Sequence, residues 1–223
     1  MAKGISNTGK SYTSTDDKMS FGDYLDLIST KPTQLRMFLF NIFKHIPDLC
    51  QDFNYPDIVD YYVKKHPFMF FGGATSKVDA HFDLDLSHVF LTQFFGKKRV
   101  VLFAPEYSTH LYRHPLTVSC NVDLGNPDFD KYPKLLDAKG YECEISDGET
   151  LFIPSGYWHY IHYTEGGFAL SLRARATHIS KLARAGFQMF NLLFVDYNMS
   201  RLLGAKRWYA MKEQMAVKRA NKL

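Results

Sequence analysis

Cysteine is scarce in this sequence, and long apolar runs are missing from it. The three cysteines among 223 residues are Cys50, Cys120 and Cys143. They are too few and too scattered for a disulfide framework or a C-x-x-C zinc site, which favours a reducing, cytoplasmic location. No apolar run reaches the roughly 18 to 20 residues that a membrane span needs, and the N-terminus lacks the apolar core of a secretory signal. We therefore expect no membrane partner.

Acidic residues are rare in the last part of the chain. Residues 173–223 hold 11 Lys and Arg but only 2 acidic residues, which leaves 16 basic and 21 acidic residues in the remainder. A basic tail can contact nucleic acid or another acidic surface. The solvated faces of terminal helices are a more common source of such a charge excess.

Aromatic residues other than tryptophan are plentiful, with 19 Phe and 14 Tyr, and these residue types favour strands. From residue 67 onward the chain consists of short apolar or alternating runs separated by Gly, Pro, Asp and Asn. These runs are PFMFFGG, VFLTQFF, RVVLFAP, YECEI, TLFIP, YWHYIHY and FALSLRA. The pattern predicts a mainly β domain, either a sandwich or a barrel.

Helices are predicted before this β region. Residues 1–19 are polar and are expected to be a loose N-terminal segment. Ser20 and Asp23 have capping-box spacing, which predicts a helix from there to about Ile28. The stretches PDLCQDF and PDIVDYYVKKH each begin with a Pro-Asp helix start, while RMFLFNIF suits a buried strand or a helix.

A helical pair is predicted after the β region. Beyond residue 176 large apolar residues recur at intervals of three and four as far as Gly204, a suitable C-terminal cap, and a second helix follows around Trp208. We expect one β domain over residues 20–176 and C-terminal helices over residues 177–223.

The stretch VDAHFDLDL, residues 78–86, places polar side chains two residues apart. In a continuous strand His81, Asp83 and Asp85 would share one face. His159 stands 76 residues beyond Asp83, in another predicted strand. Two histidines and one carboxylate can hold one face of an octahedral metal and leave its other positions open, as in non-haem Fe(II) oxygenases. By itself, H-x-D is equally consistent with a solvated surface strand.

Three longer segments carry a family resemblance: ISDGETLFIPSGYWH, AHFDLDLSHVFLTQFFGKKRVVLFAP and NVDLGNPDFDKYPKLLDAKGYE. Together they resemble the cupin-like branch of the JmjC-type oxygenases, which includes the asparaginyl hydroxylase of hypoxia-inducible factor and the tRNA wybutosine hydroxylase. The likeness covers roughly residues 20–176 and is strongest over 67–172. It implies a double-stranded β-helix (cupin or jelly roll), Fe(II), 2-oxoglutarate as co-substrate and hydroxylation of a C–H bond. His81, Asp83 and His159 match the family's metal ligands.

The same resemblance assigns the co-substrate site and shows two departures from it. Lys98 matches the lysine that pairs with the distal carboxylate of 2-oxoglutarate. Phe38 and Val78 stand where the family often has a tyrosine and a threonine, so two hydroxyl donors are missing. Arg173 stands where the hydroxylase has an asparagine near the co-substrate, and it would either clamp the co-substrate carboxylate or turn to solvent.

Three further candidate site residues also have a purely structural interpretation. His88 matches a position that often lies inside the barrel, so we expect it to support the site or to be a core or rim histidine. Thr92 is expected to donate a hydrogen bond to the co-substrate or to be structural. Asp85 is expected to support the site or face the substrate if the strand continues through it.

Two classes of function follow from these assignments. The first is an Fe(II)- and 2-oxoglutarate-dependent oxygenase that hydroxylates an unidentified protein, tRNA or small molecule. The alternative is a non-catalytic cupin-like module that binds a metal or ligand but has lost the co-substrate pocket. Helices at the C-terminus form a homodimer in the resembling hydroxylase. Here such a face would contain Phe187, Phe190, Leu193 and Phe194, unless these side chains pack onto their own barrel.

Overall fold

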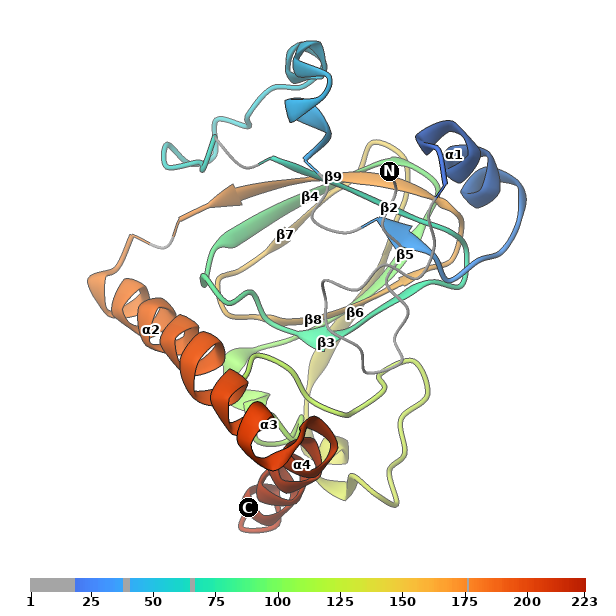
Figure 1. Cartoon of the computed structure of the whole chain (residues 1–223). Helices are drawn as coiled ribbons and strands as arrows, with labels where there is room; N and C mark the ends of the chain where they lie inside the picture. The colour runs from blue at the N-terminus through green and yellow to red at the C-terminus, as the bar shows by residue number, and fades with distance from the viewer. Residues whose placement is uncertain (1–18, 38–40, 65–66, 176) are drawn as a thin grey trace.

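Two antiparallel sheets face each other in the computed structural model, which describes residues 19–37, 41–64, 67–175 and 177–223 (Figure 1). The first sheet has the strand order β1-β2-β9-β4-β7 and the second has the order β3-β8-β5-β6. The strands are β1 (Arg36–Met37), β2 (Phe68–Gly72), β3 (Lys77–His81), β4 (His88–Phe95), β5 (Lys98–Phe103), β6 (Gly140–Ile145), β7 (Thr150–Ile153), β8 (Trp158–Tyr163) and β9 (Gly167–Ala174). The predicted mainly β, jelly-roll fold is confirmed.

One apolar cluster packs between the two sheets. Its buried members include Val89 and Leu91 on β4 and Val100 and Leu102 on β5. Because side chains alternate along a strand, these residues identify the inner face of each sheet and the residues between them the outer face. Every strand predicted from residue 67 onward is present.

The outer face of the first sheet is covered from the N-terminal side. Helix α1 (Phe21–Thr30) begins with the predicted cap, in which Ser20 Oγ accepts from the amide of Asp23 at 3.1 Å. Its buried residues Tyr24 and Ile28 pack in one cluster with Phe90 on the outer face of β4. Helix propensity, capping and burial therefore agree here.

The predictions for the three stretches between α1 and β2 were wrong or incomplete. PDIVDYYVKKH does not form a helix in its described part. Instead it runs beside the end of β9, where the amide of Val63 donates to the carbonyl of Arg173 at 2.8 Å. Pairing with a sheet edge outweighs the Pro-Asp helix signal in this stretch, which is rich in the strand-forming residues Val and Tyr.

The other two stretches form only short elements. PDLCQDF becomes the 3₁₀ helix η2 (Pro47–Gln51), and RMFLFNIF contains the two residues of β1 and the start of the 3₁₀ helix η1 (Ile42–Lys44). Two further 3₁₀ helices, η3 (Pro105–Ser108) and η4 (Pro133–Asp137), lie in the long connection between β5 and β6. Phe38 lies outside the described residues.

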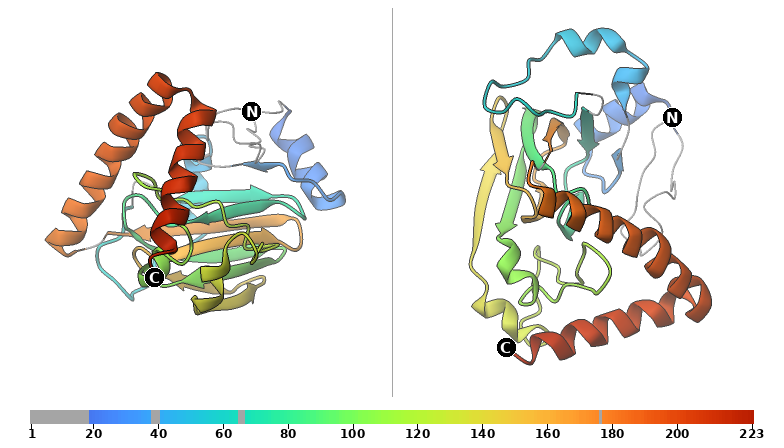
Figure 2. Two further views of the ribbon diagram at one scale, coloured as in Figure 1. Left: turned by 90° about the horizontal axis from the view of Figure 1, so that it is seen from below. Right: turned by 90° about the vertical axis from the view of Figure 1, so that its left-hand side faces the viewer.

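The C-terminal helices form a V beside the barrel (Figure 2). One arm runs through α2 (Ile179–Phe190), the π-helix η5 (Asn191–Asp196) and α3 (Tyr197–Leu203), and the other arm is α4 (Ala205–Ala220). Gly204 makes the turn with a φ of 82°, in the region that favours glycine. The predicted helical pair and its glycine cap are confirmed.

A buried polar contact holds the two arms together. Asp196, at the end of the π-helix, accepts from the indole of Trp208 at 2.8 Å and from the ammonium of Lys212 at 2.7 Å. Ala216 and Ala220 of α4 pack in one cluster with Trp158 and Phe82 of the barrel. No helix in the described part of the chain is both long and apolar enough to cross a membrane.

Candidate metal centre and barrel interior

Three side chains from two segments meet at one end of the barrel. His81 ends β3 and is the cross-strand partner of His159 on β8, and their ring centroids lie 4.2 Å apart. Asp83 follows in the turn after β3. One ligand atom from each residue lies within 4.8 Å of the others, and all three side chains can hold a metal ion. The structure therefore brings together the three residues that the sequence assigned to the metal.

Asp83 reaches this position from a turn and not from a continuous strand. The strand ends at His81, and the amide of Leu86 donates to the carbonyl of Asp83 at 3.1 Å. Leu86 adopts a φ of 52°. The strand does not continue through Asp85, so the condition for His81, Asp83 and Asp85 to share one strand face is not met.

A β-bulge in β3 sets the direction of His81. Val78 is opposite Ile161 and His81 is opposite His159, with a register shift between the two pairs. Residues three apart in a regular strand point to opposite faces, but one extra residue restores the same face. Val78 and His81 therefore both face the interior, and Ala80 packs on the outside.

Both histidines present the same ring nitrogen to the centre. Nδ1 of His81 donates to the carbonyl of Asp79 at 2.8 Å, and Nδ1 of His159 donates to the carbonyl of Tyr157 at 3.2 Å. A carbonyl can only accept, so Nδ1 carries the proton and Nε2 keeps its lone pair. This arrangement orients histidine ligands and fixes their tautomer in metal sites.

The protonation states also suit a cation. Burial lowers the pKa of His81 to about 4, with a contribution from nearby His159, and burial lowers the pKa of His159 as well. Burial would raise the pKa of Asp83, but Arg173 and the two histidines outweigh it and hold that pKa below its usual value. Neutral imidazoles and an ionised carboxylate are the forms that bind metals. The donor set therefore fits a divalent metal.

Arg173 pairs with the carboxylate of the candidate metal ligand Asp83 and is not free to bind a co-substrate. Nη2 of Arg173 is 2.8 Å from Oδ1 of Asp83, and Nη1 is 3.2 Å from Oδ1 of Asp85. Asp85 in turn accepts from the amide and hydroxyl of Ser87. Of the two expectations for Arg173, solvent exposure does not hold, and the carboxylates that it clamps belong to the protein.

Lys98 lies at the opposite end of the inner face. It is 1% exposed, its Nζ lies 4.4 Å from the ring centroid of Tyr163, and no carboxylate pairs with it among the described residues. Burial lowers the pKa of Lys98 to about 7. Lys98 is opposite Tyr163 and Leu102 is opposite His159, so about 13 Å of strand separates Lys98 from the metal centre.

Further polar side chains, which were not among the predicted site residues, line the space between these ends. Ser171 Oγ and Gln93 Oε1 are buried without a hydrogen-bond partner, and Tyr163 is 3% exposed. Buried polar atoms without partners are uncommon in folded proteins, and each calls for a ligand or water. Side-chain alternation along the strands could have predicted that these residues face inward. Tyr163 is four residues beyond His159 on the same strand, and Ser171 is two residues before Arg173. A buried, unpaired lysine with orphaned polar atoms nearby suits a small anion.

His88 and Thr92 do not join this site. Both alternate with the inward-facing residues of β4 and therefore lie on its outer face. His88 Nδ1 accepts from the amide of Ser155 at 3.1 Å, and its ring stacks on Phe152. Thr92 Oγ1 lies 2.8 Å from Thr150 Oγ1. His88 is thus a histidine at the rim of the barrel and Thr92 has a structural role, so neither residue lines the co-substrate site.

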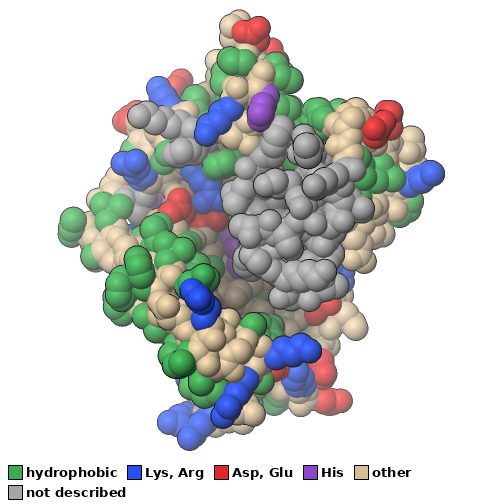
Figure 3. All heavy atoms as spheres, in the orientation of Figure 1, with side chains coloured by type: hydrophobic (Ala, Val, Ile, Leu, Met, Phe, Trp, Pro, Cys, Tyr) green, Lys and Arg blue, Asp and Glu red, His purple; other side chains and the backbone are tan. Residues whose placement is uncertain are grey.

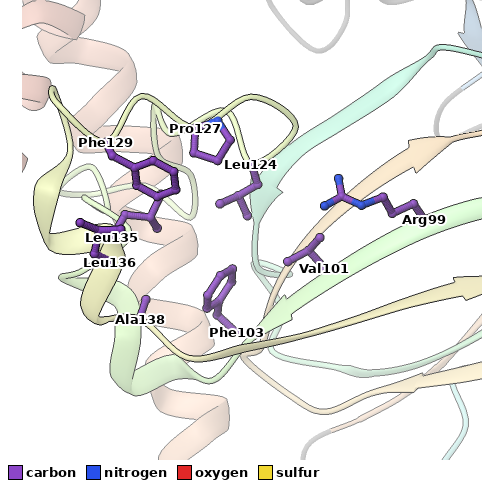
Figure 4. A pocket seen from close by; sticks show the side chains of 9 residues that line it. All are labelled: Arg99, Val101, Phe103, Leu124, Pro127, Phe129, Leu135, Leu136 and Ala138. Atoms are coloured by element: carbon purple, nitrogen blue, oxygen red, sulfur yellow. The ribbon is translucent and has the colours of Figure 1, made fainter.

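One face of the molecule is hollowed near its middle (Figure 3). Figure 3 shows charged side chains of both signs and a histidine in a recess at the middle of one face, bordered on one side by hydrophobic side chains. A second hollow of about 310 Å³ lies on the outer face of β5 and includes Val101, Phe103 and Leu135 (Figure 4). The charged group at its edge, Arg99, is bound to Glu142. This second hollow is apolar and separate from the triad.

Comparisons with known proteins agree with this arrangement. A family model described as a cupin-like domain matches residues 6–180. The tRNA wybutosine-synthesizing protein 5 of Gallus gallus is 34% identical over 140 residues, which are 62% of this chain and 42% of that protein. The lysine-specific demethylase JMJ30 of Arabidopsis thaliana is 30% identical over 167 residues, 69% of this chain and 38% of that protein. The chain thus spans less than half the length of these relatives.

Proposed function

Because the chain belongs to the cupin-like domain family, with relatives named for JmjC domains and tRNA modification, we propose that it is an Fe(II)- and 2-oxoglutarate-dependent oxygenase that hydroxylates a C–H bond. One observation carries the proposal. Neutral His81, neutral His159 and ionised Asp83 converge at one end of a barrel whose other end holds a buried, unpaired Lys98. A metal site alone would not need a buried cation at that distance.

Each protein group has a defined part in this function. His81, Asp83 and His159 would hold Fe(II), with the Nδ1 bonds keeping both imidazoles in the required tautomer. Lys98 would pair with the distal carboxylate of 2-oxoglutarate, and the dry barrel makes this pair strong. Bound Fe(II) and 2-oxoglutarate would supply the oxidising chemistry, in which one atom of O2 enters succinate with loss of CO2 and the other enters the substrate. The apolar inner residues exclude water from the site.

The substrate would bind over the triad. Relatives are named for tRNA wybutosine synthesis and for lysine demethylation, which leaves tRNA, protein and small-molecule substrates to be compared. The basic segment 173–223 favours an anionic substrate. The free thiols of Cys50, Cys120 and Cys143 suit a cytoplasmic location, which stays a prediction.

A homodimer through the C-terminal helices is a further part of this proposal. Phe187, Phe190, Leu193 and Phe194 are each more than half exposed, so they do not pack onto their own barrel. Such a row of apolar side chains is unusual on a monomer surface. We propose that a second copy covers it.

The function is tested by two measurements on the full chain. A melting experiment with Mn(II) and 2-oxoglutarate should show a higher melting temperature with both than with Mn(II) alone, because a ligand that binds only the folded protein stabilises it. Succinate should then form when Fe(II), O2 and 2-oxoglutarate are supplied, faster with tRNA, peptide or metabolite pools that contain the substrate.

The alternative, a non-catalytic module, is favoured by the apolar Val78 on the inner face. It predicts a shift with Mn(II) but none with 2-oxoglutarate. Absence of a 2-oxoglutarate shift, together with unchanged metal affinity in His81→Ala, would rule out the oxygenase.

A further inference from the structure

The guanidinium of Arg173 is shared between two carboxylates. Its Nη2 donates to Oδ1 of Asp83 at 2.8 Å, and its Nη1 donates to Oδ1 of Asp85 at 3.2 Å. An arginine beside one carboxylate commonly makes two parallel bonds that occupy both carboxylate oxygens. Here each terminal nitrogen bonds a different carboxylate. The presence of Asp85 therefore limits how much of Asp83 the arginine covers.

This sharing leaves the second oxygen of Asp83 uncovered by the guanidinium. Arg173 donates to Asp83 at Oδ1, while Asp83, His81 and His159 each offer one ligand atom within 4.8 Å of the others. An ionised carboxylate can accept at both of its oxygens. One oxygen can thus stay on the arginine while the other binds a metal. A guanidinium that covered both oxygens would compete with the metal for the same lone pairs.

Asp85 is held in place by the turn that follows it. Its Oδ1 accepts from the amide of Ser87 at 3.2 Å, and its Oδ2 accepts from the hydroxyl of Ser87 at 2.6 Å. A carboxylate that bonds the backbone two residues further on forms an Asx-turn, which fixes its direction. In the same turn the carbonyl of Leu86 accepts from the hydroxyl of Ser155 at 2.6 Å. Ser155 precedes β8, so the turn that anchors Asp85 is tied to the segment that leads to His159.

Asp85 itself does not belong to the ligand set. Among the described residues, the side chains whose ligand atoms converge are His81, Asp83 and His159. The side chain of Asp85 is 46% exposed, against 14% for Asp83, and both of its oxygens already accept hydrogen bonds. Any effect of Asp85 on a bound metal must therefore act through Arg173 or through space as charge.

We propose that Asp85 is a positioning residue for the metal centre. It holds one side of the Arg173 guanidinium, so that Arg173 orients Asp83 through one oxygen and leaves the other to the metal. This inference rests on the metal site of the proposed function, and it adds a residue outside the three ligands. The Arg173–Asp83 pair keeps the carboxylate ionised, and the Arg173–Asp85 pair keeps the arginine from displacing the metal.

The test measures the affinity of the full chain for Mn(II) by titration calorimetry in Asp85→Asn. Asparagine keeps the size of the side chain and an oxygen for Ser87, but it has no charge to hold the guanidinium. Arg173 can then turn to both oxygens of Asp83. We expect Mn(II) to bind roughly ten- to a hundredfold more weakly than to the wild type.

Asp123→Asn is the matched control. Asp123 is 48% exposed and pairs at 3.6 Å with Lys77, which lies on the same strand as His81. The control therefore removes an equally exposed, paired carboxylate next to β3 without touching Arg173. It should bind Mn(II) as the wild type does. A loss in Asp123→Asn as large as that in Asp85→Asn would overturn the positioning role.

Two further measurements separate positioning from the loss of a negative charge. In the Arg173→Leu background, Asp85→Asn should change the Mn(II) affinity by less than about twofold, because the residue through which Asp85 acts is gone. A direct effect of charge would persist or grow there. The visible spectrum at saturating Co(II) reports the ligands of the metal, so it should change in Asp85→Asn, whereas a charge effect would leave it unaltered.

The outcomes distinguish this inference from the function on which it rests. Unchanged Mn(II) affinity in Asp85→Asn would overturn the inference and leave the proposed function intact. An equal loss with and without Arg173, or an unaltered Co(II) spectrum, would do the same. If Arg173→Leu does not fold, the Co(II) spectrum alone decides. Failure of the wild type to bind Mn(II) would overturn both the inference and the proposed function.

Discussion

Arg173 and Asp83 form a buried ion pair at the metal centre, with Nη2 of Arg173 2.8 Å from Oδ1 of Asp83 and the two side chains 18% and 14% exposed. The carboxylate that would bind the metal is thus neutralised by the protein itself. Removing one partner of a buried pair leaves the other charge uncompensated, which costs more than the pair contributes. This relationship gives Arg173 a role in holding Asp83 ionised and oriented.

Replacing Arg173 by leucine should therefore destabilise the metal-free protein. We expect the free energy of unfolding to fall by roughly 3 kcal/mol, because Asp83 is left buried beside two neutral histidines. Mn(II) should then stabilise the variant more than the wild type, since the cation takes over the neutralising charge. Urea denaturation with and without Mn(II) measures both effects.

Arg99→Leu is the matched control for this prediction. Arg99 also makes a two-point contact with a carboxylate, at 2.7 and 2.8 Å to Glu142, but on the outer face, where the two side chains are 31% and 55% exposed. Its loss should cost about 0–1 kcal/mol. A loss as large as that of Arg173→Leu, or equal stabilisation of wild type and Arg173→Leu by Mn(II), would contradict the role of Arg173.

The metal assignment predicts a difference among the histidines of β3 and β8. His81→Ala and His159→Ala should each lower the affinity for Mn(II) by at least about a hundredfold, because each removes one of three ligands. His162→Ala should leave it unchanged, since His162 is opposite Lys77 and alternates away from His159. Calorimetry of Mn(II) binding at neutral pH decides the matter. Equal loss in all three variants would mean that the fold, and not the ligand set, had been damaged.

The sequence predicted the strands and the three metal residues because both follow from local pattern. His81 and His159 stand in alternating runs, and the flanking segments fix their order along the barrel. The direction in which each side chain points was harder to predict from the sequence. Regular alternation would separate Val78 from His81, and only the bulge between them, which depends on pairing with β8, brings both inside.

Contacts between distant parts of the chain also account for most of the other differences between the predictions and the structure. Arg173 was assigned to a co-substrate carboxylate, but the turn after β3 places Asp83 and Asp85 nearer to it. His88 matched a position inside the barrel of the family, and Thr92 was a candidate hydrogen-bond donor on a predicted strand, yet side-chain alternation along β4 turns both outward. Tyr61 and Val63 carry a helix start signal in front of them and still pair with β9. In each case the partner lies far away in the chain, where local pattern carries no information.

The pKa of Lys98 predicts how co-substrate binding depends on pH. A dicarboxylate pairs with the ammonium form, and burial lowers the pKa of Lys98 in the ligand-free protein to about 7. Above that pH binding must also take up a proton, so the affinity for 2-oxoglutarate should fall by up to about tenfold per pH unit and level off below it. Calorimetry across this range, with Lys97→Met as the exposed control, measures the slope. A flat profile would contradict the pairing.

The same lysine should cost the empty protein stability. The unfolded chain keeps the ordinary pKa of 10.5, so between pH 7 and 10.5 it binds more protons than the folded state, and stability rises with pH in that window. Lys98→Met should raise the free energy of unfolding at pH 7 by at least about 1 kcal/mol and abolish 2-oxoglutarate binding. Chemical denaturation tests the first effect. A destabilised Lys98→Met protein would mean that Lys98 has a structural partner.

The exposed face of the C-terminal helices predicts a self-associating protein. Phe190 and Phe194 stack at 5.2 Å on this face and are 53% and 57% exposed. Sedimentation velocity should give the mass of two chains, and Phe190→Asp should give one, because a carboxylate in an apolar interface is left without a partner. Tyr141→Asp, at a site 70% exposed on β6, is the control and should stay dimeric.

An interface formed by apolar burial persists at high salt, whereas association through the basic residues of this segment would weaken. A wild type that sediments as one chain at tens of micromolar would exclude the dimer, and retention of the dimer in Phe190→Asp would place its interface elsewhere.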